Sequence, residues 1–298
     1  MNLAPIVLFV YNRPEHTKKT VEALQLNQFA DESVLHIYSD GNKNENDRKS
    51  VEEVRNFIST ITGFKEIKII LRDRNLGLAN SVITGVTEVI NEYGKAIVLE
   101  DDIVTSPYFL KFMNEALDFY EADKKIYSIS GYSFPIKIPK SYPHQVYISS
   151  RASSWGWATW QDRWRRVDWN PEKSFNVYDK KELRNIMDRA GKDLAPMLLK
   201  SIEGKIDSWA VKVAFTQLKS NLFCLFPIKS LTKNIGTDAS GTNFIKSTNK
   251  YEVKSYESLK EFSFLKEFEY SDKINDQIKK IVRPGILSFL KYRLFNLY

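Results

Sequence analysis

The stretch Ala96-Ile97-Val98-Leu99-Glu100-Asp101-Asp102 is a short apolar run that ends abruptly in three carboxylates. Such a run between polar residues is typical of a buried strand. Three adjacent carboxylates repel one another unless a cation or hydrogen-bond donors compensate them. Their oxygens suit Mg2+ or Mn2+, held through one or two carboxylates plus substrate phosphates, and Asp102 is the preferred ligand. A solvated acidic loop, or the cap of a helix beginning near Ser106 and Pro107, stays an alternative.

Similar apolar runs precede this one and alternate with helix-length amphipathic segments. The predicted strands are Pro5 to Val10, Val34 to Ser39, Ile67 to Leu71 and Ala96 to Leu99, each expected to be buried. The predicted helices are Glu15 to Leu26, Arg48 to Thr60 and Ala79 to Tyr93. Strands joined by crossovers of this length form β-α-β units, so the sequence predicts an α/β fold with a mostly parallel, Rossmann-like sheet.

Polar side chains follow each predicted strand. Ligands of open α/β sheets bind beyond the carboxyl ends of the strands, so these residues are the first candidates for a site. They are Tyr11-Asn12-Arg13-Pro14, Asp40-Gly41-Asn42, Arg72-Asp73-Arg74-Asn75-Leu76-Gly77 and Glu100-Asp101-Asp102.

The organisation along the chain predicts one catalytic domain and an extension. Residues 1–243 form the domain, with a nucleotide-binding half at 1–102 and a donor-sugar and acceptor half at 103–243. The second half holds five of the six tryptophans between Trp155 and Trp169, and a helical pattern passes through Val211, Phe215 and Leu218. Residues 244–298 form a lysine-rich C-terminal extension that ends in an amphipathic, helical stretch.

Composition limits the class of protein. The 298 residues are 43% hydrophobic and 27% charged, which is ordinary for a globular chain. The formal charge of +7 favours an anionic partner such as nucleotide phosphates, lipid headgroups or nucleic acid. Cys224 is the only cysteine, lies in an apolar run and is expected to be buried. With no apolar stretch long enough to cross a bilayer, these features favour the cytoplasm.

Several of these stretches together resemble the GT-A glycosyltransferases, which share a nucleotide-diphospho-sugar transferase fold. Ile97 to Pro107 resembles the acidic metal motif of that fold in its N-acetylglucosaminyltransferase I-like form. Ile6 to Pro14 and Tyr38 to Gly41 are similar to the first two strand ends of that family. Arg74 to Ala79 resembles the asparagine-x-glycine segment of the family 2 glycosyltransferases. The matches run in order through roughly the first 165 residues.

The resemblance implies a role for each matched residue. It implies that Arg13 and Asp40 contact the nucleoside, that Asn75 belongs to the donor site, that Glu100 and Asp101 lie near the ribose and donor sugar, and that Asp102 binds Mn2+ or Mg2+. It further implies a UDP-sugar donor and inversion at the anomeric carbon, by a hexosyl- or N-acetylhexosaminyltransferase. Surface charge explains Arg13 equally simply, and an Asp-Gly turn explains Asp40.

A general base is also required, because an acceptor hydroxyl must lose its proton as the sugar–phosphate bond breaks. Asp207, before Ser208-Trp209, resembles the family's catalytic carboxylate, although Ile206 and Ser208 depart from the family pattern. A helix N-cap is the alternative for Asp207. Trp155 and Trp157 are predicted to line the sugar pocket, whereas core packing is preferred for Trp164 and Trp169.

Two late segments suggest further contacts. Residues 234–241 lie where the family has a mobile loop closing over the diphosphate, with a plain surface loop as the alternative. Residues 277–298 carry five basic residues and no acidic one, which indicates either peripheral binding to an anionic membrane, on its inner face, or a packed terminal helix. The expected acceptor is a glycan or lipid-linked glycan, in polysaccharide or lipopolysaccharide assembly.

Two other classes of function remain to be weighed. Sugar-phosphate nucleotidyltransferases share the sheet and the metal but open with a glycine-rich loop, which Tyr11 to Pro14 does not provide. A basic adaptor for membranes or nucleic acid explains the charge but leaves the three acids unexplained, so no nucleic-acid partner is expected. The chain has no P-loop, no zinc-ligand spacing and no nucleophile elbow.

Overall fold

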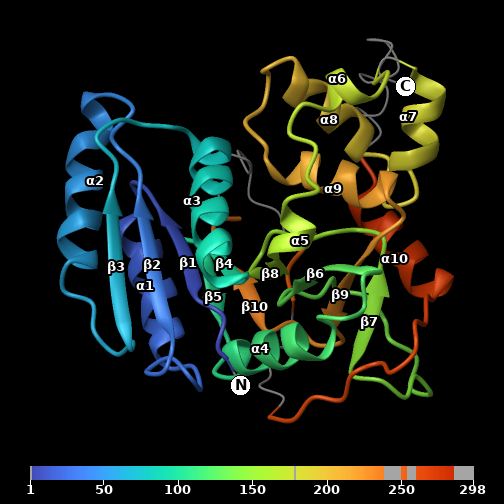
Figure 1. Ribbon diagram of the computed structural model, residues 1–298, viewed down its shortest axis with the longest axis horizontal. Helices are drawn as coiled ribbons and strands as arrows, with labels where there is room; N and C mark the ends of the chain where they lie inside the picture. The colour runs from blue at the N-terminus through green and yellow to red at the C-terminus, as the bar shows by residue number, and fades with distance from the viewer. Residues whose placement is uncertain (1, 178, 238–249, 254–259, 285–298) are drawn as a thin grey trace.

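The computed structural model describes residues 2–177, 179–237, 250–253 and 260–284 (Figure 1). Its first half alternates strands and helices as the apolar periodicity predicts. The elements are β1 (Ile6–Val10), α1 (Pro14–Gln25), β2 (Val34–Ser39), α2 (Glu45–Ile58), β3 (Glu66–Leu71), α3 (Leu78–Tyr93) and β4 (Lys95–Glu100). Each lies within a few residues of its prediction.

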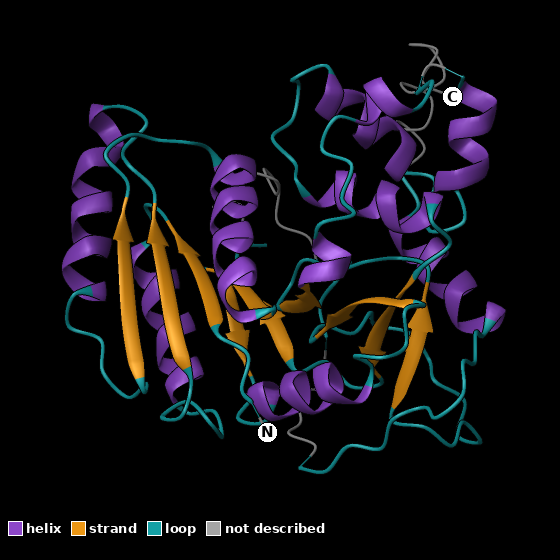
Figure 2. Ribbon diagram, in the orientation of Figure 1, coloured by secondary structure: helices purple, strands orange, loops and turns teal. Residues whose placement is uncertain are grey.

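One eight-stranded sheet runs through the molecule in the order β3-β2-β1-β4-β8-β6-β9-β7 (Figure 2). Strands β3, β2, β1 and β4 are parallel to one another. The predicted α/β fold with a largely parallel sheet is therefore confirmed. The chain runs outward from β1 to β3 and then returns to β4 on the other side of β1, which makes the β1–β4 boundary a topological switch point.

The second half of the chain completes the sheet. Its elements are β5 (Ile103–Thr105), α4 (Phe109–Phe119), β6 (Ile126–Ser130), β7 (Val146–Ser149), β8 (Trp157–Trp160), α5 (Gln161–Trp164), α6 (Pro171–Ser174), α7 (Lys180–Met187), α8 (Leu194–Ile202), α9 (Ala210–Lys219), β9 (Phe223–Pro227) and β10 (Thr232–Asn234). Strand β8 is antiparallel to both β4 and β6, so the sheet is mixed on this side. The predicted helix through Val211, Phe215 and Leu218 is α9.

Helices cover both faces of the sheet. The core on one face contains side chains of α1, α2 and α4, and the core on the other contains side chains of α3, α5 and α9. A third apolar cluster joins α7, α8 and α9, which gather at the upper right in Figure 1. Trp164 is buried in the α3 core and Trp169 packs against it, as predicted.

The prediction that all four N-terminal strands are buried is wrong for β3. This strand is the edge of the sheet, and it alternates partly covered and exposed side chains, with Leu71 52% exposed. An edge strand has a neighbour on one side only, so apolar residues in its sequence need not be covered.

The C-terminal extension contributes to the core. Leu265 is buried with the α4 core, Tyr270 bridges to Ile148 of β7, and α10 (Asp272–Val282) buries Ile274 and Ile278. The beginning of the predicted basic segment is thus a packed helix, whereas residues 285–298 lie outside the described residues. Among the helices that the structure describes, none is both long and apolar enough to cross a bilayer. Cys224 is fully buried, as predicted.

Candidate functional site

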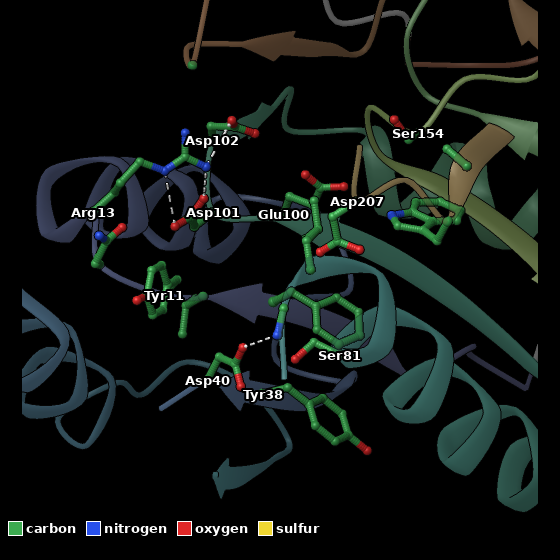
Figure 3. A pocket seen from close by; sticks show the side chains of 18 of the residues that line it. Tyr11, Arg13, Tyr38, Asp40, Ser81, Glu100, Asp101, Asp102, Ser154 and Asp207 are labelled. Atoms are coloured by element: carbon green, nitrogen blue, oxygen red, sulfur yellow. Dashed lines mark hydrogen bonds and ion pairs between the residues drawn. The ribbon is translucent and has the colours of Figure 1, made fainter. Parts of the chain in front are cut away.

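A cavity of about 330 Å³ opens at the switch point, beyond the carboxyl ends of β1, β2 and β4 (Figure 3). Its walls also include the start of α3, the segment before α9 and the end of β10. Of the predicted site residues, Arg13, Asp40, Asn75, Glu100, Asp101, Asp102, Trp155 and Asp207 all line it. Segments far apart in the sequence therefore meet at one place, because parallel strands end at a common edge.

The three carboxylates at the end of β4 point in different directions. Glu100 is still paired within the sheet, in register with Phe9, and both residues line the cavity. Asp101 and Asp102 follow the strand and face Arg13, which begins the turn into α1 (Figure 3). The acidic run is thus divided into a carboxylate on the Phe9 side and a carboxylate pair on the Arg13 side.

Arg13 is the internal counter-ion of that pair. Its guanidinium pairs with Asp101 and lies 3.0 Å, Nη2 to Oδ2, from Asp102. Burial lowers the pKa of Arg13, but the two carboxylates outweigh burial and raise the pKa above its ordinary value. The Arg13 guanidinium, expected from the resemblance to meet a nucleoside, is thus engaged by carboxylates in this structure.

Burial and mutual repulsion shift the pKa values of two carboxyl groups of the acidic run, Glu100 and Asp101. Burial and then the charges of Asp102 and Asp101 raise the pKa of Glu100 to about 8, against the opposing effects of Arg13 and a hydrogen bond from Trp209. Burial also raises the pKa of Asp101, to about 6, against the opposing charge of Arg13. Strong perturbation of neighbouring acids in one cavity is typical of a functional site.

Asp40 and Asn75 hold two loops together at the cavity wall. Both carboxylate oxygens of Asp40 accept backbone hydrogen bonds, from Leu76 at 3.0 Å and from Gly77 at 3.1 Å. The Asn75 amide donates to the Gly41 carbonyl at 2.8 Å, and its oxygen accepts from the Gly77 nitrogen at 3.2 Å. The asparagine-x-glycine segment therefore shapes the wall of the cavity through Asp40.

Asp207 lies on the Glu100 side of the cavity, away from Asp101 and Asp102, and reaches the start of α3 (Figure 3). Its Oδ2 accepts from the Ala79 nitrogen at 3.3 Å, and a helix N-terminus favours a negative charge. The N-cap position of the following helix, α9, is Trp209, so Asp207 does not cap that helix. Gly77 has φ 78°, and a Cβ there would stand 2.9 Å from Asp207 Oδ2. The glycine provides the room that lets the exposed Asp207 approach.

Of the two tryptophans predicted to line the sugar pocket, Trp155 lines this cavity and Trp157 does not. Trp157 begins β8, is 3% exposed and stacks on Trp209 with ring centroids 5.0 Å apart. The pairing of β8 with β4 places Trp157 opposite Val98 in the α3 core. Trp209, on which Trp157 stacks, lines the cavity together with Trp155.

The corner at Asp102 fits a divalent cation held by few protein ligands. Asp102 Oδ1 is buried and has no hydrogen-bond partner in the described part of the chain. Within the same residues, no three His, Cys, Asp or Glu side chains are placed to share one ion. A cation here would therefore take one or two carboxylate oxygens and complete its shell with phosphates and water, which is the usual binding mode of Mg2+.

The end of β10 covers this corner. The Ile235 nitrogen donates to the Asp102 carbonyl at 2.9 Å, and a Cβ on Gly236 would collide with Asp102 Oδ2. Asn234 and Gly236 line the cavity, which places the start of the predicted closing loop at the site. The remainder of that loop, residues 238–241, lies outside the described residues.

Several cavity residues had no predicted role of their own, among them Tyr11, Lys43, Ser81 and Trp209. The Tyr11 hydroxyl donates to Asp47 at 2.9 Å and accepts from the Lys43 nitrogen at 2.9 Å, which fixes its ring. Tyr11 and Trp209 adjoin predicted residues, so their positions were a usable signal. Ser81 lies inside a helix pattern, and its sequence neighbours carry no such signal.

No family model matches the chain, and a search of curated proteins finds no match. Solved structures similar to it are glycosyltransferases. Mouse xyloside xylosyltransferase 1 has 11% identity and a TM-score of 0.40, over 76% of this chain and 84% of that one. The mannosyltransferase PcManGT of Pyrobaculum calidifontis, with GDP-Man and Mn2+, has 11% identity and a TM-score of 0.39, over 74% and 77%.

A third similar structure is S. aureus TarS 1-349 with UDP, at 12% identity and a TM-score of 0.35, covering 53% of this chain and 47% of that one. Another TarS structure is covered over 28% of its length, so this chain spans less than half of these two TarS chains. With every TM-score below 0.5, these similarities do not by themselves assign a function.

Proposed function

We propose that this chain is a GT-A glycosyltransferase that moves a sugar from a nucleoside diphosphate, preferably UDP, to a hydroxyl of a glycan. The observation that carries the proposal is the charge pattern of one cavity. Asp102, with a buried unpartnered oxygen, lies at one side, and the exposed carboxylate of Asp207 lies at the other. A corner that suits a cation and a second, exposed carboxylate in the same cavity suit glycosyl transfer.

Asp102 is the proposed metal ligand, with Asp101 beside it and Arg13 able to neutralise phosphate. A bound Mn2+ or Mg2+ would supply positive charge to the diphosphate as it leaves. The nucleoside would contact the Tyr11 ring, which hydrogen bonds hold in place, and the loop that Asp40 anchors. The phosphates would lie near Arg13 and Lys43, the two cationic side chains among the described residues of the cavity wall.

Asp207 is the proposed general base. It would accept the proton of the acceptor hydroxyl while that oxygen bonds to the anomeric carbon. The bond from the anomeric carbon to the phosphate oxygen would break, and its electron pair would leave with the diphosphate. Asp207 faces the cavity from the side opposite the metal corner, which supports attack opposite the leaving group and hence inversion.

The acceptor is proposed to be a glycan or lipid-linked glycan, as in polysaccharide or lipopolysaccharide assembly, and the transferred group a hexose or N-acetylhexosamine. Residues 277–298 would bring the enzyme to an anionic membrane surface on the cytoplasmic side. Exposed Lys280 on α10 supports this role. Co-sedimentation with phosphatidylglycerol vesicles, but not with phosphatidylcholine vesicles, tests it, and equal binding to both would contradict it.

A thermal-shift panel tests the function itself. We expect UDP-sugars to raise the melting temperature more than GDP-, dTDP- or CMP-sugars, and only with Mn2+ or Mg2+ present. Hydrolysis of the donor should need the cation and vanish in Asp102→Ala. Equal activity in a chelator would remove the ligand role of Asp102, and release of pyrophosphate from a nucleoside triphosphate plus sugar phosphate would instead indicate a nucleotidyltransferase.

A further inference from the structure

Ser81, in the first turns of α3, has a buried hydroxyl that the described part of the chain leaves without a partner. The residue is 5% exposed and lines the cavity, and its Oγ has no hydrogen bond. Serine and threonine inside helices commonly bond back to the carbonyl four residues earlier. Thr84 and Thr87 of the same helix do so, at 2.7 and 2.6 Å. Ser81 is the exception among these hydroxyl side chains, and it is the one at the cavity.

A buried hydroxyl without a partner costs stability, so its presence at a cavity wall calls for a partner inside the cavity. Ser81, Glu100 and Asp207 line the same cavity (Figure 3). Phe9, next to Glu100 in the sheet register, and Trp209 provide aromatic surface there. A molecule bound between these residues would supply the missing partner of Ser81.

The charges around the cavity indicate what that molecule is. Arg13 and Lys43 are the cationic residues of the described cavity wall; the Lys43 backbone nitrogen donates to the Tyr11 hydroxyl, and Arg13 pairs with Asp101 and Asp102. The Ser81 side presents the carboxyl groups of Glu100 and Asp207. Carboxyl groups and a serine hydroxyl suit the hydroxyls of a sugar, and aromatic rings suit its C–H faces. A further carboxylate on the ligand would meet the exposed carboxylate of Asp207.

We infer that Ser81 hydrogen-bonds the sugar of the bound donor and that this end of the cavity selects uncharged sugars over uronic acids. The inference rests on the proposed function and names the class of sugar that it transfers. It also assigns specificity to a helix residue outside the acidic run and its neighbouring loops.

Isothermal titration of Ser81→Ala with UDP, UDP-glucose, UDP-galactose, UDP-N-acetylglucosamine and UDP-glucuronate, all with Mn2+, tests the inference. The wild-type chain should bind at least one uncharged UDP-sugar more tightly than UDP, and UDP-glucuronate more weakly than that sugar. Ser81→Ala should lose about three- to tenfold in affinity for the uncharged sugar and keep its affinity for UDP. Its melting temperature without ligand should be unchanged or higher, because an unsatisfied hydroxyl is removed.

Ser106→Ala is the matched control. Ser106 is also fully buried with an unpartnered Oγ, but it does not line the cavity, so its removal should change no nucleotide-sugar affinity. Equal weakening of UDP and UDP-sugar in Ser81→Ala, no weakening, or a preference for UDP-glucuronate would each overturn the inference. If the wild-type chain binds none of the five nucleotides, the proposed function fails and takes the inference with it.

Discussion

Arg13 and Asp102 face each other at 3.0 Å beside the cavity, and the same guanidinium also pairs with Asp101. Asp101 and Asp102 are buried, and the Arg13 side chain is 20% exposed. The carboxylate pair thus has a built-in counter-ion, placed where the proposed cation would bind. Arginine and a divalent cation would satisfy the same two groups.

Because Arg13 is the counter-ion of the two carboxylates, its removal should lower the stability of the protein, and a bound metal ion should restore part of that stability. Arg13→Ala in the presence of a chelator should destabilise the protein by about 3 kcal/mol, because it leaves two buried carboxylates without their partner. Saturating Mn2+ should restore part of that loss by supplying positive charge. Urea denaturation in chelator and in Mn2+ measures both effects.

Arg48→Ala is the control for this prediction, since Arg48 pairs with Glu45 and Glu52 on an exposed helix face. Exposed pairs contribute little, so the unfolding midpoint should stay nearly constant with or without metal. If Arg13→Ala and Arg48→Ala behaved alike, the counter-ion role would be refuted.

Asp207→Asn should abolish transfer without loss of donor binding. The amide oxygen of asparagine can still accept a hydrogen bond from the Ala79 nitrogen, but it is too weak a base to take the proton of the acceptor hydroxyl. The rate of sugar transfer should therefore fall about 100-fold or more. UDP affinity by calorimetry should match wild type. Asp179→Asn is a suitable control, because Asp179 also accepts from backbone nitrogens at a helix start, that of α7. Full transfer activity in Asp207→Asn would show that the base lies elsewhere.

Gly77→Ala should impair catalysis out of proportion to its effect on folding. The alanine would hold an unfavourable positive φ, costing about 1 to 3 kcal/mol, and its Cβ would press on Asp207. Gly204 also has a positive φ, of 69°, but a Cβ there meets nothing within 4 Å. Gly204→Ala should therefore lose stability alone. Thermal melts measure the loss of stability from backbone strain in each variant, and steady-state kinetics measure the effect of displacing Asp207. Equal activity in Gly77→Ala and Gly204→Ala would contradict a functional contact between Gly77 and Asp207.

Cys224 should be unreactive in the folded protein. Burial raises the pKa of its thiol to about 12, and only the thiolate attacks disulfide reagents. The neutral thiol is the form that the folded state favours, so its contribution to stability is present below the ordinary thiol pKa and is lost as pH rises toward 12. An aromatic disulfide reagent at pH 8 should react within seconds in denaturant and negligibly without it. Rapid reaction of the folded chain would show that β9 opens locally.

The sequence predicted the N-terminal half closely because its signals are local. The apolar run before Glu100 and the amphipathic segment after Gly77 each carry their own periodicity, and polar residues follow every strand. The convergence of Arg13, Asp40 and the acidic run follows from the parallel topology alone. Burial of β3 was predicted wrongly because the order of strands, and hence the edge, depends on contacts between elements distant in sequence.

Residue roles were harder to assign than elements. Trp155 and Trp157 are two positions apart, and only the pairing of β8 with β4 sends Trp157 into the core while Trp155 stays at the cavity. Nothing around Ser81 distinguishes it from Thr84, since a missing hydrogen bond is visible only in three dimensions.

The amino-acid sequence by itself determined the α/β pattern, the acidic strand end and the set of loops that gather there, because these depend on local periodicity and on parallel strands ending together. Only the tertiary structure decided that Glu100 turns away from Asp101 and Asp102, that Arg13 occupies the acidic pair, and that Asp207 reaches Ala79 from 128 residues away. Sheet register, charge pairing and burial are set by the folded environment as a whole, and no short stretch of sequence contains them.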